Sequence, residues 1–342
     1  MKVAIYYGSN DIRYEDYSKP IIKENEVLIE MKACGLCGSD LMDWYLEKRA
    51  PLVLGHEPAG IIVEIGDKVK KFQLYDKVFV HHHVSCLTCH YCTHGSFTVC
   101  PKFRETHIDP GGFAEYFRVP AENLEIDTIK IPNNLSFEEA TLIEPIACCI
   151  KGMMKCNIKP GDIIAIIGAG PSGIIFTQLS KIYNVSKIIV IDSIKYRLEI
   201  AKKFGADIII NYHEEDPIKI IKENSDNRGA DVVIVTAPNI NAYSEAFKIC
   251  RKGGMILAFA PINPNEFLQL SIHNMFFSEI SLIPSYSTSH IETRMALNLI
   301  LSNKIKTKEL ITHKFKLSQV KEAIKLAKEN KECLKIVILN EK

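Results

Sequence analysis

Apolar and polar residues alternate in short runs over the first 130 residues, and Gly, Pro and Asn separate the runs. Period-two alternation between turn residues is typical of half-buried strands in an all-β, barrel-like unit. The strands predicted by this pattern are residues 2–7, 26–33, 60–66, 76–82 and 113–119. Ser136 and Glu139 then form a capping box before an apolar run, which predicts a helix that passes Glu144 toward residue 155.

The pattern changes after residue 160, where continuous apolar runs alternate with helical stretches. The apolar runs are residues 163–167, 187–191, 207–210, 231–235 and 255–259. The helical stretches lie near residues 172–183, 195–204, 216–224 and 241–251. This alternation is the signature of an α/β unit, a parallel sheet doubly wound with helices on both faces. The last residues predict strand and helix again, ending in a strand at 334–339.

Length and composition limit the classes of protein that this chain can belong to. Its 342 residues suggest two domains. The 42 basic and 41 acidic residues form no long block of one sign, which argues against a role in binding nucleic acid or a membrane surface. The chain starts without a signal-peptide pattern and has no apolar stretch of membrane-spanning length, so we expect a cytoplasmic protein. Disulfides are rare in that reducing compartment, so eleven cysteines point to metal binding.

A glycine-rich turn lies between an apolar strand and a helix. Gly168, Gly170 and Gly173 fit G-x-G-x-x-G, whose glycines let the backbone approach a pyrophosphate at the start of a helix. Asp192 ends the next apolar run, where a carboxylate can accept hydrogen bonds from ribose hydroxyls and repels a 2′-phosphate. The order of strand, glycine turn, helix, second strand and aspartate predicts a dinucleotide site. Asp192 favours NAD over NADP, although basic residues follow it. The alternative is a turn without a ligand.

Four cysteines with short spacings predict a structural metal site. Cys86, Cys89, Cys92 and Cys100 follow the pattern C-x2-C-x2-C-x7-C. Four thiolates can close a tetrahedron around Zn²⁺ with no open position, so such a site stabilises the fold rather than taking part in catalysis. The alternatives are four buried small residues or an iron–sulfur cluster, and the spacing favours zinc.

A second set of metal-ligating residue types is spread along the chain, at Cys37, His56, Glu57 and Glu144. Each has an ordinary structural explanation, since a lone Cys is usually buried and a lone His or Glu is usually solvated or paired. Together they offer a thiolate, an imidazole and carboxylates, which suits a catalytic zinc with one exchangeable position. The residues alone leave both interpretations open.

Three consecutive histidines, residues 81–83, fall at the end of a predicted strand. Successive side chains of a strand point to opposite faces, so the three cannot converge on one ion. We therefore expect them to be ordinary strand residues.

The segment from Gly55 to Val69 resembles the zinc signature of the zinc-dependent medium-chain dehydrogenase/reductase family, and the cysteine and glycine motifs match in order and approximate spacing. The resemblance spans essentially the whole chain. It implies a GroES-like β-barrel catalytic domain, residues 1–145 and 287–342, with a structural zinc lobe at 86–100. A Rossmann domain, residues 146–286, would be inserted between the two parts.

The same resemblance implies roles for individual residues. Cys37 and His56 would bind the catalytic zinc, Glu57 and Glu144 would share the remaining place with water, and Ser39 would pass the substrate proton outward. The residues that would contact the nucleotide are Ile174, Asp192, Arg197, Ser285 and Tyr286. A carboxylate at Glu144, where alcohol dehydrogenase has a cysteine, is more similar to the sorbitol (polyol) and threonine dehydrogenase branches.

Two positions depart from those branches. Met42 stands where many relatives have a histidine, and a thioether cannot relay a proton. Asp43 and Trp44 also differ from the Tyr-Trp of sorbitol dehydrogenases.

The resemblance implies hydride transfer between NAD and a secondary alcohol, namely a polyol, a sugar alcohol or a hydroxy-amino acid such as threonine. It also implies a homo-oligomer, for which we favour a tetramer. The alternatives are a zinc-free quinone or enone reductase on the same scaffold and a nucleotide-binding protein without turnover.

Overall fold

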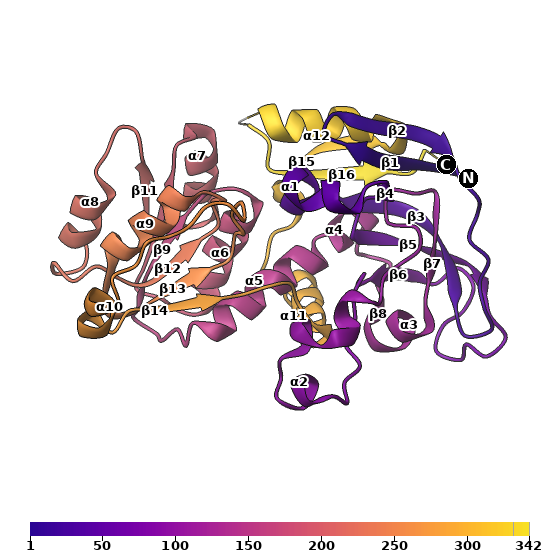
Figure 1. Cartoon of the computed structure of the whole chain (residues 1–342), viewed down its shortest axis with the longest axis horizontal. Helices are drawn as coiled ribbons and strands as arrows, with labels where there is room; N and C mark the ends of the chain where they lie inside the picture. The colour runs from indigo at the N-terminus through magenta and orange to yellow at the C-terminus, as the bar shows by residue number, and fades with distance from the viewer. Residues whose placement is uncertain (331, 342) are drawn as a thin grey trace. The chain divides into compact units, whose positions relative to one another are not determined.

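The computed structural model describes residues 1–330 and 332–341; Lys331 and Lys342, both in the segment predicted as 287–342, lie outside the described residues. The chain forms two compact units (Figure 1). Unit 1 comprises Met1–Ala147 and Ser287–Lys342, and unit 2 comprises Cys148–Tyr286. Unit 2 is thus inserted into the sequence of unit 1. None of the helices within the described residues is long and apolar enough to cross a membrane.

Unit 1 is built on two β-sheets. A three-stranded sheet has the order β2-β1-β4, and a larger sheet has the order β15-β16-β3-β5-β6-β8, with β7 also pairing with β3. The strands are β1 Lys2–Gly8, β2 Asp11–Asp16, β3 Val27–Gly35, β4 Leu52–Val53, β5 Glu57–Ile65, β6 Lys77–Val80, β7 Tyr116–Val119, β8 Thr128–Lys130, β15 Ile311–Lys316 and β16 Lys335–Leu339. All these pairings are antiparallel except β15 with β16.

Strands from the two ends of the chain share the larger sheet. Ile338 of β16 pairs with Cys34 of β3, and Figure 1 shows the C-terminal strands beside the N-terminal ones. The core between the sheets includes Met31, Phe113 and Phe117, all without exposed surface. The helices of unit 1 are α1 Asp43–Leu46, α2 His90–Thr93, α3 Ala121–Asp127, α4 Phe137–Ala140, α11 His290–Leu301 and α12 Val320–Glu329. A further helix, α5 (Ile143–Lys155), begins in unit 1 and ends in unit 2.

Unit 2 is a six-stranded sheet of order β11-β10-β9-β12-β13-β14, and all its pairings are parallel. Its strands are β9 Ile163–Ile167, β10 Lys187–Asp192, β11 Ile208–Asn211, β12 Ala230–Val235, β13 Cys250–Ala258 and β14 Ser281–Pro284. Its helices are α6 Pro171–Ile182, α7 Lys195–Phe204, α8 Pro217–Glu223, α9 Ile240–Ile249 and α10 Ile272–Ser278. Every residue of β9 and β12 is buried, as expected for strands covered on both faces. The strand order is that of a Rossmann fold, and it reverses direction between β9 and β12.

The architecture confirms the predicted fold class, a barrel-like β unit with an inserted Rossmann unit. One predicted strand, residues 76–82, is wrong at its end, because β6 stops at Val80. The histidines after Val80 are therefore not in a strand, and the alternation rule does not govern where their side chains point. The sequence pattern also missed β14, in which the first and last residues are exposed and none is fully buried.

Candidate functional site

Four cysteine sulfur atoms meet in the lobe around α2. Cys89 Sγ lies 3.6 Å from Cys92 Sγ and 3.7 Å from Cys100 Sγ. Cys86 Sγ lies 3.6 Å from Cys100 Sγ and 4.0 Å from Cys92 Sγ. A Zn–S bond of about 2.3 Å puts the corners of a tetrahedron about 3.8 Å apart, so the four sulfur atoms fit one zinc ion. Hydrogen bonds, chiefly from Thr88, lower the pKa of Cys86 to about 6, which favours the thiolate that a metal needs.

A second group of ligand atoms forms where β3 ends and β5 begins. Cys37 follows β3, His56 immediately precedes β5, and Glu57 is the first residue of β5. One ligand atom from each of these residues lies within 4.8 Å of those of the other two. The pairing of β3 with β5 produces this meeting, because Gly35 lies directly opposite Glu57. One thiolate, one imidazole and one carboxylate are three ligands. A metal such as Zn²⁺ held by them would keep one coordination position open.

Asp40 holds two of these ligands in place. Its Oδ2 accepts a hydrogen bond from the Cys37 backbone N–H at 3.0 Å, and its Oδ1 lies 3.5 Å from His56 Nδ1. Burial alone would lower the pKa of His56, but the negative charges of Asp40 and Cys37 outweigh burial and raise it well above its ordinary value. An acidic neighbour of this kind orients a metal-binding histidine.

Glu57 is paired with a lysine from the far end of the chain. Lys335 Nζ of β16 forms an ion pair with Glu57 Oε2, and both side chains are almost completely buried. Burial raises the pKa of Glu57, and Lys335 opposes that shift. Gly35 makes room for the carboxylate, since a Cβ there would lie 1.8 Å from Glu57 Oε2. The pair fixes Glu57 while its Oε1 has no hydrogen-bond partner among the described residues.

Glu144 of α5 groups with two of the three consecutive histidines. One ligand atom from each of His81, His82 and Glu144 lies within 4.8 Å of the other two. The rings of His81 and His82 are 5.2 Å apart, and those of His82 and His56 are 4.9 Å apart. The prediction that His81 and His82 are strand residues is wrong, because β6 ends before them, and their side chains lie close together. His83 differs, since its Nδ1 contacts the Thr106 carbonyl.

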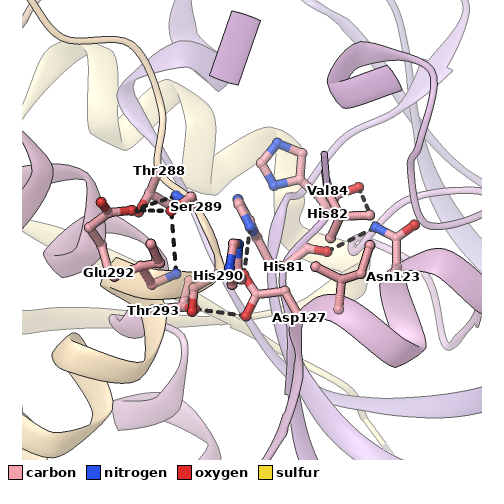
Figure 2. A network of polar contacts seen from close by, with 12 residues as sticks. His81, His82, Val84, Asn123, Asp127, Thr288, Ser289, His290, Glu292 and Thr293 are labelled. Atoms are coloured by element: carbon pink, nitrogen blue, oxygen red, sulfur yellow. Dashed lines mark hydrogen bonds and ion pairs between the residues drawn. The ribbon is translucent and has the colours of Figure 1, made fainter. Parts of the chain in front are cut away.

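Buried acidic and amide groups fix these two histidines. His81 Nδ1 lies 2.9 Å from Asp127 Oδ2, and Asn123 Nδ2 donates to the carbonyls of His81 and His82 at 3.1 and 3.0 Å. Figure 2 shows His81 turned toward Asp127, with the ring of His82 nearby. Burial, followed by the neighbouring histidines, lowers the pKa of His82 well below its ordinary value.

Ser39 and Met42 lie close to Cys37 in the chain. Ser39 is part of the short 3-10 helix Gly38–Leu41 and is half-buried. Met42, also half-buried, follows that helix and donates its backbone N–H to the Ser39 carbonyl at 3.3 Å.

The glycine-rich turn joins β9 to α6 in unit 2. Gly168 has φ +106°, a left-handed conformation that favours glycine. A Cβ on Gly173 would lie 1.9 Å from the Gly168 carbonyl oxygen, so only glycine lets the turn close on the helix. Gly170 is the residue before α6, and a Cβ there would meet no atom within 4 Å. The turn therefore leaves space over the N-terminus of α6, where a pyrophosphate can bind.

Asp192, the last residue of β10, lies beside this turn. Its Oδ2 accepts from the Ala169 N–H at 2.6 Å, and its Oδ1 accepts from the Ile194 N–H at 2.8 Å. Arg197 is on α7, the helix after Asp192. Ile174 follows Gly173 on α6, and its side chain is fully buried. The structure thus brings Asp192 to the glycine turn and leaves Ile174 no exposed side chain for a ligand.

Ser285 and Tyr286 follow β14 in unit 2. The Ser285 hydroxyl is buried and has no hydrogen-bond partner among the described residues. Tyr286 is exposed, and its carbonyl accepts from Lys151 Nζ at 2.8 Å.

Sequence reasoning missed four residues that shape these sites, namely Asp40, His82, Asp127 and Lys335. The acidic residue of G-S-D, three positions after Cys37, was a usable signal for Asp40. Nothing near Lys335 or Asp127 in the sequence indicates a role, because their partners are distant in the chain.

Comparison with known proteins matches both units to one family. Residues 23–133 match the family model described as alcohol dehydrogenase GroES-like domain, and residues 171–302 match zinc-binding dehydrogenase. Sorbitol dehydrogenase of Bacillus subtilis (strain 168) is 34% identical, covering 99% of this chain and 97% of that protein. D-arabinitol dehydrogenase 1 of Uromyces fabae is 30% identical, covering 98% of this chain and 96% of that protein. The structure of alcohol dehydrogenase TADH from Thermus sp. ATN1 aligns with a TM-score of 0.88 at 26% identity, over 100% of both chains.

Proposed function

Because this chain belongs to the zinc-dependent alcohol dehydrogenase branch of the medium-chain dehydrogenase/reductase family, we propose that it oxidises a polyol and passes the hydride to NAD. The observation that carries the proposal is the incomplete ligand set of Cys37, His56 and Glu57, which leaves room for a substrate hydroxyl. The names of the sorbitol and D-arabinitol dehydrogenases support a polyol or sugar alcohol over a plain alcohol. A hydroxy-amino acid such as threonine is the second candidate substrate.

Cys37, His56 and Glu57 would hold the catalytic zinc. Glu144, whose charge acts on Glu57, would be the neighbouring carboxylate. When bound, zinc lowers the pKa of a substrate hydroxyl, and the nicotinamide accepts the hydride. Asp40 keeps the His56 ring in place, and Lys335 compensates the charge of Glu57. Both contacts reduce the freedom of the ligands before any ion binds.

Ser39 Oγ accepts the proton that leaves the substrate hydroxyl. Its position in the turn after Cys37 supports this role. The next step cannot use the thioether of Met42, so the proton passes from Ser39 to solvent or to the ribose hydroxyls.

NAD is the proposed cofactor, and NADP is less favoured. The carboxylate of Asp192 lies beside the glycine turn and would repel a 2′-phosphate. The residues proposed to contact the nucleotide are Gly168, Gly170, Gly173, Ile174, Asp192, Arg197, Ser285 and Tyr286. Because the side chain of Ile174 is buried, its contact would come from the main chain.

A substrate panel tests the proposal directly. Purified protein with zinc would receive polyols, threonine, simple secondary alcohols and quinones, each with NAD and with NADP. We expect NAD reduction with polyols above all. Reduction of quinones without zinc would support the zinc-free reductase instead. No activity with any substrate, while zinc and NAD are bound, would support a protein without turnover.

We further propose a homo-oligomer, with a tetramer as the favoured state, in the cytoplasm. Large apolar side chains exposed on the surface support an interface between subunits. Four such side chains of unit 2 have 67 to 80% of their surface exposed, namely Phe267, Ile272, Phe276 and Phe277. Eleven cysteines, four of them grouped as candidate metal ligands, suit a reducing compartment. Light scattering measures the mass in solution, and a monomer would contradict the proposal.

A further inference from the structure

We propose that Asp43 is a positioning residue for the reaction, because its carboxylate anchors the turn that carries Cys37 and Ser39. We call this segment, residues 37–46, the Cys37 turn. Asp43 lies six positions after Cys37 and acts through the turn rather than by touching the substrate. The inference rests on the proposed function and deepens it, since it names what keeps a metal ligand and the proton acceptor in place.

The carboxylate of Asp43 joins three parts of unit 1 that are distant in the sequence. Lys328 Nζ of α12 donates to its Oδ2 at 2.9 Å and to its Oδ1 at 3.1 Å. Tyr6 Oη of β1 donates to Oδ1 at 3.1 Å, and Ser9 Oγ, between β1 and β2, donates to Oδ2 at 3.0 Å. One side chain at the start of α1 therefore ties that helix to α12, to β1 and to the β1–β2 connection.

The charges of these groups keep the donors and the acceptor in their roles. Burial would raise the pKa of Asp43, but hydrogen bonds from Lys328, Ser9 and Tyr6 outweigh burial and lower it. Burial, together with the Asp43 carboxylate, raises the pKa of Tyr6. Asp43 is thus held as a carboxylate and Tyr6 as a phenol, and hydrogen bonds to an ionised acceptor are the stronger kind.

Hydrogen bonds within the Cys37 turn connect this anchor to the metal ligand. The N–H of Asp40 donates to the Cys37 carbonyl at 3.1 Å, and the N–H of Met42 donates to the Ser39 carbonyl at 3.3 Å. The N–H of Leu46 in turn donates to the Met42 carbonyl at 3.1 Å. Asp40 holds one end of the turn at Cys37 and His56, and Asp43 holds the other end, so displacement of α1 would be passed back toward Ser39 and Cys37.

Trp44 provides a direct report on this turn. It is the one tryptophan of the chain and follows Asp43 immediately. It is half-buried, and its ring lies edge-on to that of Tyr45, with the centroids 5.9 Å apart. Its fluorescence can be measured without substrate, so anchoring of the turn can be tested separately from turnover.

The anchor can be removed without unfolding the protein. The side chains of Lys328 and Asp43 are each 32% exposed, and ion pairs in contact with solvent contribute little to overall stability. Asp43→Asn keeps the size of the side chain and removes its charge. Lys328→Gln removes the cation and leaves Asp43 its hydrogen bonds from Tyr6 and Ser9.

Fluorescence and steady-state kinetics of the full, zinc-loaded chain test the inference. In Asp43→Asn we expect the Trp44 emission to shift to longer wavelength and acrylamide to quench it more strongly, because the turn loosens. We expect kcat, with the polyol of the panel that gives the highest kcat/KM, to fall by roughly 10–100-fold, since small displacements of reacting groups are costly. KM for NAD should not change, because the nucleotide residues lie in unit 2. Lys328→Gln should change emission and kcat in the same direction by less.

Asp11→Asn is the matched control. Asp11 also pairs with a cation, since Arg13 Nε and Nη2 donate to its two oxygens at 2.7 and 2.6 Å, but both residues belong to β2 and not to the Cys37 turn. This variant should keep the emission and the kcat of the unsubstituted protein. An equal loss of kcat in Asp11→Asn and Asp43→Asn would overturn the inference, because the loss would then not depend on the turn.

The inference requires both changes in Asp43→Asn. Unchanged emission would mean that Asp43 does not anchor the turn, and an unchanged kcat would mean that the anchor does not position the reacting groups. Either result would overturn it. Failure of the proposed function is distinguishable, because it appears as absence of turnover in the unsubstituted protein, where the fluorescence comparison still decides whether Asp43 anchors the turn.

Discussion

The four-cysteine lobe and the Cys37–His56–Glu57 centre both gather metal ligands in unit 1, but they are built in opposite ways. All four lobe ligands come from 15 consecutive residues, 86–100, and their sulfur atoms already form a closed set. The open centre takes its ligands from two strand ends that meet through the pairing of β3 with β5. Its supporting residue, Lys335, comes from β16.

The closed ligand set suits a role in stability, and the open ligand set suits a role in catalysis. A closed tetrahedron has no position for a substrate and contributes its binding free energy to folding. An open centre must hold ligands in place before the substrate arrives, and here Asp40 and Lys335 do so. We therefore expect the order of the lobe to depend on a bound metal, and the order of the open centre to depend on the fold around it.

Substitution of Cys37 should have the largest effect, and it concerns turnover alone. Cys37→Ser removes the thiolate of the open centre, and we expect kcat/KM to fall by roughly 10⁴-fold. NAD affinity, measured by fluorescence titration, should not change, because the nucleotide residues all lie in unit 2. Cys333→Ser, at a buried cysteine of unit 1 outside the ligand groups, serves as the control and should keep turnover.

Substitution in the lobe should act on stability instead. Cys89→Ser opens the tetrahedron, and loss of a structural metal is among the changes that cost more than about 4 kcal/mol of unfolding free energy. Denaturant unfolding and metal analysis would measure the loss of stability together with the loss of one ion. If the variant kept its stability and its full metal content, the lobe would not be a zinc site.

Removal of Lys335 should test how the open centre is supported. Lys335→Met leaves the Glu57 carboxylate buried without its partner, which we expect to cost roughly 3–5 kcal/mol in unfolding experiments. The double variant Glu57→Gln/Lys335→Met removes both charges and should recover part of that loss. Equal stability of the single and double variants would mean that the unpaired Glu57 charge is not what destabilises the single variant.

The sequence predicted what depends on local spacing. The four-cysteine lobe, the glycine turn and the capping box at Ser136 all follow from residues a few positions apart. The structure shows that capping box at the start of α4, but the single helix predicted from there toward residue 155 is divided into α4 and α5. The parallel sheet of unit 2 was also predictable, because strands buried on both faces are continuously apolar.

Long-range features and exact strand ends were not predictable. The partnership of Lys335 with Glu57 requires the register of β16 and β5 on β3, which no local pattern encodes. The side chains of His81 and His82 lie close together because β6 ends at Val80. An apolar residue followed by histidines gives no signal for that end, because histidine is compatible with strand and with loop.

The place of β16 in the larger sheet has a consequence for how the protein is made. β16 lies between β15 and β3, so the sheet cannot close until residues beyond the inserted unit have been synthesised. Domains generally fold as units during translation, and long-range pairings form slowly. Unit 2 is one continuous segment, so we expect it to fold on the ribosome before unit 1 is complete. The ion pair of Lys335 with Glu57 would then form only in the last stage of folding.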